Sequence, residues 1–174
     1  TEACQIIDGI MDKHHGKLMV KGKSMVSEEV ELNHYLEARG KEAIESDMGE
    51  YIVQMAHEKP THIVMPAIHK TKQQISKLFH DNLNTPLTDD VDEMIQIGRK
   101  ALRDVYRTAD VGLSGVNFAV AETGTLCLVE NEGNGRLSTT VPPVHIAITG
   151  IEKVVARLDD VVPLYSLLTR SAVG

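Results

Sequence analysis

Residues 115–150 constrain the fold most, because they combine three short apolar runs with two sharp polar breaks. On either side of Thr123, Gly124 and Thr125, apolar residues alternate with smaller or polar ones, which is typical of two strands joined by a tight turn. Glycine suits such a turn because it adopts positive φ at little steric cost. The segment therefore predicts an antiparallel hairpin over 116–129, with Glu122 at its end.

A polar loop is expected after the hairpin, because residues 130–136 offer too few apolar side chains to bury. Rigid strands on either side would hold this loop while it supplies polar groups. The planar guanidinium of Arg136 suits a carboxylate ligand. The alternative is a flexible surface loop. The ligand contacts expected from the loop are Asn131, Glu132, Gly133, Asn134 and Arg136.

Helices and strands alternate along the rest of the chain, which predicts an α/β domain with a mainly parallel sheet. Further strands are expected at 17–21, 42–46, 62–65 and 145–149. Helices are expected at 3–15, from an N-cap at Ser27 to Gly40, around Ile52, around Ile75, at 90–105 and at 160–169. No repeat or linker interrupts the pattern, so residues 1–174 are interpreted as one domain.

Two turns after expected strands are candidate ligand sites, because ligands of open α/β sheets collect beyond the carboxyl ends of the strands. The first turn offers Lys23 and Ser24 at a helix start, with Glu28 in the first helical turn. The second offers Asp47, Gly49 and Glu50. For both turns the alternative is an ordinary capped helix, with Asp47 as N-cap of the second.

Two histidines, His69 and His145, follow apolar or proline-containing segments and are expected near a cleft. No histidine pair has the helical spacing, with a neighbouring acid, that marks a zinc site. We therefore expect no protein-bound metal. The cysteines, Cys4 and Cys127, are too few for a [4Fe–4S] cluster, which takes about four thiolates, and are expected to be small buried side chains.

The overall charge of -7 argues against nucleic acid or an anionic membrane as partner. No apolar run approaches the ~20 residues of a membrane helix, and no signal-peptide pattern begins the chain. We therefore expect no membrane insertion and a cytoplasmic location.

Several separated motifs resemble one family. AETGTLCLVENEGNGR followed by HIAITGIEK, together with KGKSMVSEEVELNHYLEARG, ESDMGEYIVQ and HIVMPAIH upstream, is similar to the LUD domain of lactate-utilisation proteins, most closely those of the iron–sulfur type. The resemblance implies a NagB/RpiA/CoA-transferase-like three-layer α/β domain, with a mainly parallel sheet and an added antiparallel hairpin. It also implies a component of an iron–sulfur-dependent system that oxidises L-lactate to pyruvate, with other lactate-utilisation subunits as partners.

The same resemblance implies that this chain is an excised or short LUD domain without a cofactor of its own. The [4Fe–4S] clusters are expected only in full-length relatives. The domain would supply a pocket for a small carboxylate or other anion, or a docking surface.

Two alternatives remain open: an independent enzyme resembling CoA transferases or sugar-phosphate isomerases, and a non-catalytic scaffold. Related CoA transferases use a glutamate nucleophile, to which Glu122 is compared, although ETGT departs from their SENG-like motif. Thr123, Gly124 and Thr125 would then contact the ligand. In every case we expect the hairpin end, the glycine-rich segment and the turn at Lys23 to meet around one cavity.

Overall fold

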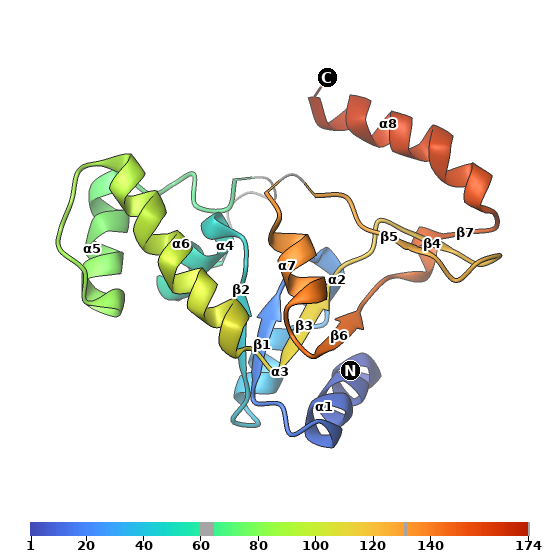
Figure 1. The fold of residues 1–174 in the computed structure, drawn as a ribbon, viewed down its shortest axis with the longest axis horizontal. Coiled ribbons are helices and arrows are strands. Elements are labelled where there is room, and N and C mark those ends of the chain that lie inside the picture. Colours follow the sequence, from blue (N-terminus) through green and yellow to red (C-terminus); the bar gives the residue numbers. More distant parts are fainter. Residues whose placement is uncertain (60–64, 131, 174) are drawn as a thin grey trace.

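The structure, a computed structural model, describes residues 1–59, 65–130 and 132–173. Its centre is a parallel sheet, sheet A, with strand order β2-β1-β3-β6 (Figure 1). The strands are β1 (Leu18–Lys21), β2 (Glu42–Glu45), β3 (Val111–Ser114) and β6 (Val144–Ala147). The mainly parallel α/β architecture expected from the sequence is confirmed.

One face of sheet A is covered by α1 (Glu2–Lys13), α2 (Met25–Glu29) and α3 (Leu32–Glu37). Side chains on strands point alternately to the two faces, and Met19, Val111 and Ile146 point to this one. They pack there against apolar side chains of the helices, among them Met11 and Leu36.

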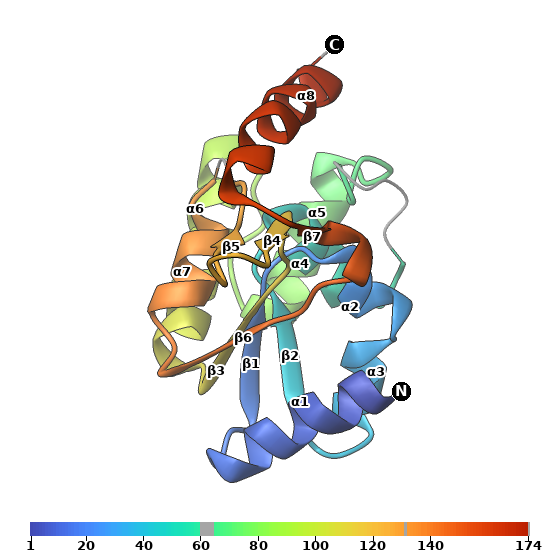
Figure 2. The same ribbon diagram turned by 90° about the vertical axis from the view of Figure 1, so that its right-hand side faces the viewer.

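The other face is covered by α4 (Met48–Met55), α6 (Val91–Thr108) and α7 (Asn134–Thr140), while α5 (Lys72–Leu83) packs on α4 and α6. Val20 points to this side and packs with Tyr51 and Leu102. Figure 2 shows the sheet between the two helical layers. This helix–sheet–helix arrangement fits the expected three-layer fold.

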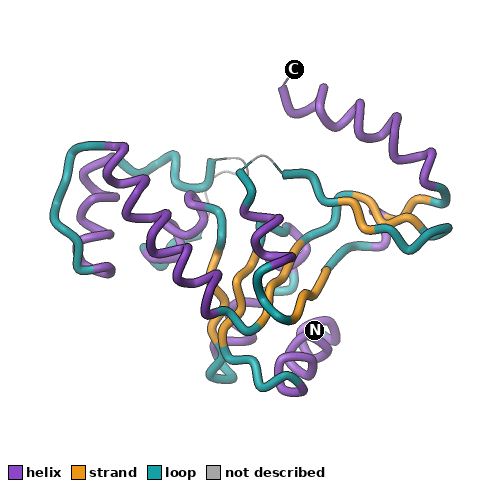
Figure 3. The backbone as a smooth tube through the Cα atoms, viewed as in Figure 1, coloured by secondary structure: helices purple, strands orange, loops and turns teal. Residues whose placement is uncertain are grey.

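A small second sheet, sheet B, lies to one side of the layers (Figure 3). It consists of β4 (Phe118–Val120), β5 (Leu126–Cys127) and β7 (Val154–Val155). The β4–β5 pair is antiparallel, so the predicted hairpin is confirmed, and β7 pairs with β4 in parallel. Short 3-10 turns, Ile151–Lys153 and Leu158–Asp160, flank β7, and α8 (Val161–Val173) then extends away from the body. In the described ranges, no helix has the length and apolar character needed to cross a bilayer.

The structure differs from the local predictions in three places, and a fourth prediction falls mostly outside the described residues. Ser24, not Ser27, caps α2, because its hydroxyl accepts the Ser27 amide. The structure contains a strand that the sequence does not predict, β3, and the helix α7 begins within the expected polar loop. The strand expected at 62–65 falls mostly on residues 60–64, which are outside the described residues, and Met65 is not in a strand.

Candidate functional site

A cavity of about 220 Å³ opens at the carboxyl ends of β1 and β3, beside the first turn of α7. This is the edge of a parallel sheet where ligands collect in α/β proteins. A second hollow of about 240 Å³ shares Asp47 and Glu132 with it. The residues that line the first cavity are Gly22, Lys23, Asp47, Ser114, Gly115, Leu128, Val129, Glu130, Glu132, Asn134 and Gly135.

The rim of this cavity is fixed by the turns that follow β1 and β2. The Gly22 amide donates to the Leu113 carbonyl at 2.8 Å, which ties the β1 turn to β3. Asp47 caps α4 by accepting the amides of Gly49 and Glu50 at 3.0 and 3.2 Å, so the N-cap interpretation of Asp47 is confirmed. Its other oxygen lies 3.4 Å from Lys23 Nζ, and this ion pair joins the two turns.

The opposite wall comes from the segment that leads into α7. The Glu130 carboxylate accepts the Arg136 amide at 2.6 Å and lies 3.2 Å from Arg136 Nη2. It thereby satisfies an amide of the first helical turn, which otherwise lacks an acceptor. Arg136 is thus held against Glu130 on the outside of α7, while Asn134 and Gly135 face the cavity.

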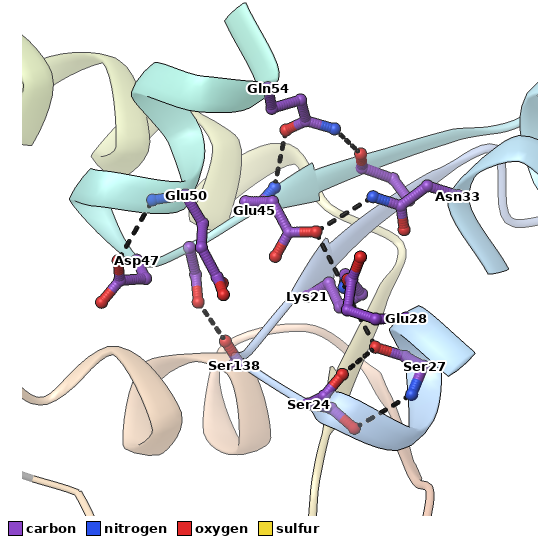
Figure 4. Close-up of polar contacts among 12 residues, drawn as sticks. Lys21, Ser24, Ser27, Glu28, Asn33, Glu45, Asp47, Glu50, Gln54 and Ser138 are labelled. Atoms are coloured by element: carbon purple, nitrogen blue, oxygen red, sulfur yellow. Dashed lines mark hydrogen bonds and ion pairs between the residues drawn. The ribbon is translucent and has the colours of Figure 1, made fainter. Parts of the chain in front are cut away.

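A buried ion cluster lies behind the rim, shown in Figure 4. Lys21 is only 1% exposed, and its ammonium contacts Glu28, Ser27 Oγ at 3.0 Å and Glu45 Oε1 at 2.8 Å. Asn33 donates to the same Glu45 oxygen at 3.0 Å. Burial by itself lowers the pKa of Lys21, but the Glu45 and Glu28 carboxylates outweigh it and raise that pKa above the ordinary value.

Glu50 extends this cluster and is an acid with a strongly raised pKa. Burial first, and then the neighbouring Glu45 carboxylate, raise its pKa to about 8 against the pull of Lys23 and Lys21. The Oε2 atoms of Glu45 and Glu50 are both buried without a hydrogen-bond partner among the described residues. When Glu50 is protonated it is uncharged, so it adds no further unpaired charge to this buried cluster.

Replacing Glu50 with glutamine should therefore change how stability depends on pH. Because the folded-state pKa is raised from 4.5 to about 8, folding takes up a proton and wild-type stability falls as pH rises through that window. The glutamine variant should lack this fall and be more stable at high pH by on the order of 2–3 kcal/mol, after allowance for partial exposure. Thermal unfolding from about pH 5 to about pH 9 measures it.

Glu122→Gln is the matched control, because Glu122 is an exposed carboxylate in the turn after β4, and a glutamine oxygen there can still accept the Leu158 amide. This variant retains Glu50, so its stability should still fall between about pH 5 and about pH 9. Parallel curves for wild type and Glu50→Gln would contradict a protonated Glu50.

The structure brings together about half of the predicted ligand residues. Lys23, Asp47, Glu132 and Asn134 line the cavity, and Gly49 lines the adjoining hollow. Three others support the rim without lining it: Ser24 caps α2, and Glu28 and Glu50 belong to the ion cluster. Gly133 is the N-cap of α7, with φ of 84°, and Asn131 lies outside the described residues.

Other predicted residues lie elsewhere. Glu122 is at the end of sheet B, where its carboxylate accepts the Leu158 amide at 3.3 Å, and the Thr123 and Thr125 hydroxyls bond each other at 2.8 Å beside Gly124. His69 bonds Glu58 at 2.7 Å. The expectation that the hairpin end shares the cavity is not met, whereas the turn at Lys23 and the glycine-rich segment do meet there.

Sequence reasoning did not single out two functional side chains of the site, Ser114 and Lys21, or several lining residues such as Gly22 and Leu128. Ser114 ends an unpredicted strand, and its Oγ lies 2.8 Å from Nε2 of His145, a predicted site residue that does not itself line the cavity. A signal for Lys21 was present, since a lysine directly after Leu18, Met19 and Val20 continues a buried strand and needs carboxylate partners there.

The two cysteines do not fit an iron–sulfur cluster. Cys4 is buried in α1, where its thiol donates to the Val30 carbonyl at 3.3 Å, and Cys127 lies in β5 of the other sheet. In the described part of the chain, no three or more His, Cys, Asp or Glu side chains are grouped to hold a metal ion.

Comparison with known proteins places the chain in a family. The LUD domain family matches residues 1–174. "Lactate utilization protein B" of Bacillus pumilus (strain SAFR-032) is 47% identical over 174 residues, which are 99% of this chain and 37% of that protein. The protein of the same name from Bacillus subtilis (strain 168) is 46% identical, over 99% of this chain and 36% of its own length. The chain thus spans just over a third of these relatives, and no solved structure matches it significantly. The chain belongs to the LUD domain family.

Proposed function

We propose that this LUD domain acts in lactate utilisation, as a cytoplasmic component of an iron–sulfur-dependent system that oxidises L-lactate to pyruvate. The name of its relatives, lactate utilization protein B, supports the role. The clusters that carry the electrons would belong to other parts of that system. Within it, this chain would hold a small carboxylate in the cavity at the end of sheet A.

The observation that carries the ligand proposal is the Lys23 ammonium in the cavity wall. Among the described residues its one ion pair, with Asp47, is long at 3.4 Å, which leaves donors of the ammonium for a ligand. One of the wall's acids, Glu130, is already compensated by Arg136. At ~30 Å³ per water molecule, about 220 Å³ has room for several waters and hence for a small hydroxy acid.

Calorimetric titration with L-lactate, D-lactate, pyruvate and acetate tests this proposal. We expect L-lactate or pyruvate to bind, and Lys23→Met to weaken that binding by at least about tenfold, because a charge-assisted hydrogen bond contributes about 1.5–3 kcal/mol. Lys77→Met is the matched control, since Lys77 pairs with Asp81 on the exposed face of α5. Equal affinity in Lys23→Met and wild type would rule out this cavity as the carboxylate site.

A docking role is a second candidate, and the exposed apolar side chains around sheet B and α8 favour it. Ile151, Val162 and Leu167 are 90%, 68% and 63% exposed. These side chains would form part of an interaction surface, and the partners would be other lactate-utilisation subunits. If no ligand binds in the titration while such subunits still co-purify with the chain, docking is the function and the ligand proposal fails.

A further inference from the structure

Ser114 and His145 lie on neighbouring strands and form a hydrogen-bonded pair at the cavity wall. Ser114 is the last residue of β3 and His145 the second of β6. In the ladder, Gly112 is opposite His145 and Ser114 is opposite Ala147, so the two side chains project from the same face. The distance from Ser114 Oγ to His145 Nε2 is 2.8 Å.

The two residues differ in their access to solvent. Ser114 is only 3% exposed and lines the cavity, so a reactant would reach its hydroxyl through that cavity. His145 is an exposed residue overall, so a proton accepted at its ring can be passed on to water. Partial burial lowers the pKa of His145 below its ordinary value, which favours the neutral imidazole that can accept a proton.

A serine hydroxyl is a weak nucleophile until an adjacent base takes its proton. We propose that Ser114 is a nucleophile with His145 as its base, and that the cavity accepts small acyl esters or thioesters. Ser114 Oγ forms a bond to the acyl carbon while its proton moves to His145 Nε2. The bond from the acyl carbon to the alcohol or thiol then breaks, and the departing group takes that proton.

The same cavity contains a group that can stabilise this reaction. Negative charge develops on the acyl oxygen during the attack, and the Lys23 ammonium in the wall is the cation that would face it. Water would then attack the acyl carbon while His145 takes a proton from it. The bond from the acyl carbon to Ser114 Oγ breaks, His145 returns the proton to that oxygen, and the acid leaves. With a volume of about 220 Å³, the cavity has room for a short acyl group.

Methanesulfonyl fluoride is the probe that tests the pair. Ser114 Oγ would bond to its sulfur, fluoride would leave, and His145 would take the proton. We expect one adduct per folded chain, mapped to Ser114 by peptide mass spectrometry, and none on the urea-unfolded chain. His145→Gln should label at least about 100-fold more slowly, the usual contribution of a general base. Hydrolysis of p-nitrophenyl acetate should be lost in Ser114→Ala.

Ser166→Ala is the matched control, because Ser166 is an exposed serine on α8 whose hydroxyl donates to the Val162 carbonyl. It should label at the wild-type rate. Adducts spread over several serines, or an equal rate in His145→Gln with a wild-type melting temperature, would overturn the proposal. Mapping on the wild-type chain decides the matter even if Ser114→Ala does not fold, and the result is independent of whether lactate binds.

Discussion

Lys21→Met is expected to destabilise the chain by about 3–5 kcal/mol, the usual loss when one partner is removed from a buried ion pair. Lys21 is 1% exposed, and the Glu45 residue that it neutralises is 5% exposed. Methionine retains much of the apolar stem but leaves the Glu45 carboxylate buried without its cation. At roughly 2–4 °C per kcal/mol for a chain of this size, the melting temperature should fall by roughly 10 °C.

The loss should be present in full at neutral pH. Burial lowers the pKa of Lys21, but Glu45 and Glu28 raise it beyond this, so the net folded-state pKa lies above the ordinary 10.5. A group with a raised folded-state pKa stabilises the fold below its unfolded pKa and loses this effect as pH rises through the folded value. The stabilisation by Lys21 is therefore lost only in the alkaline range above 10.5.

Two matched variants separate this charge effect from packing. Lys21→Met combined with Glu45→Gln should recover at least half of the loss, because a neutral amide needs no cation and its oxygen can still accept from Asn33. Lys77→Met removes the exposed pair with Asp81, so it should change stability by less than about 1 kcal/mol. Urea unfolding measures all three, and a wild-type midpoint for Lys21→Met would refute a stabilising role for the cluster.

The sequence predicted best where one strong local signal was enough. The helix α6 follows from the spacing of Met94, Gly98 and Leu102, all buried, and from an Asp90 carboxylate that accepts two first-turn amides. The hairpin follows from alternation around Gly124, whose φ is 69°. In both cases the residues that determine the element lie within it.

Prediction from the sequence was wrong or incomplete for elements whose formation depends on contacts with residues far away in the chain. The strand β3 is only four residues long and buried throughout, so the alternation of Val111 and Leu113 with Gly112 and Ser114 is too short to identify it. The helix α7 has little apolar sequence of its own and depends on Glu130 and on close packing against β3. The turns at Lys23 and Asp47 were predicted as parts of the site because the end of a strand can be recognised from residues next to it in the sequence. The position of Glu122 was not, because pairing of β4 with β7 carries the hairpin into sheet B.

Gly112→Ala is expected to displace α7 and to destabilise the chain by about 3 kcal/mol or more. A Cβ at position 112 would lie 1.8 Å from the Ser138 carbonyl oxygen and 2.9 Å from its carbon, which are backbone atoms of a residue with 0% exposure. Overpacking of a core costs about 1–3 kcal/mol even when side chains can adjust. Here the helix backbone itself would have to move.

Gly9→Ala is the control that isolates the close approach, since a Cβ at Gly9 meets no atom within 4 Å. Gly9 lies inside α1, where alanine is favoured over glycine, so this variant should gain about 0.4–1 kcal/mol in stability.

Hydrogen exchange should show faster exchange of the α7 amides in Gly112→Ala only. Because Asn134 and Gly135 of α7 line the cavity, the same variant should also bind any cavity ligand more weakly. Unchanged α7 exchange together with wild-type stability would mean that β3 and α7 can separate without loss, and that the cavity wall does not depend on their contact.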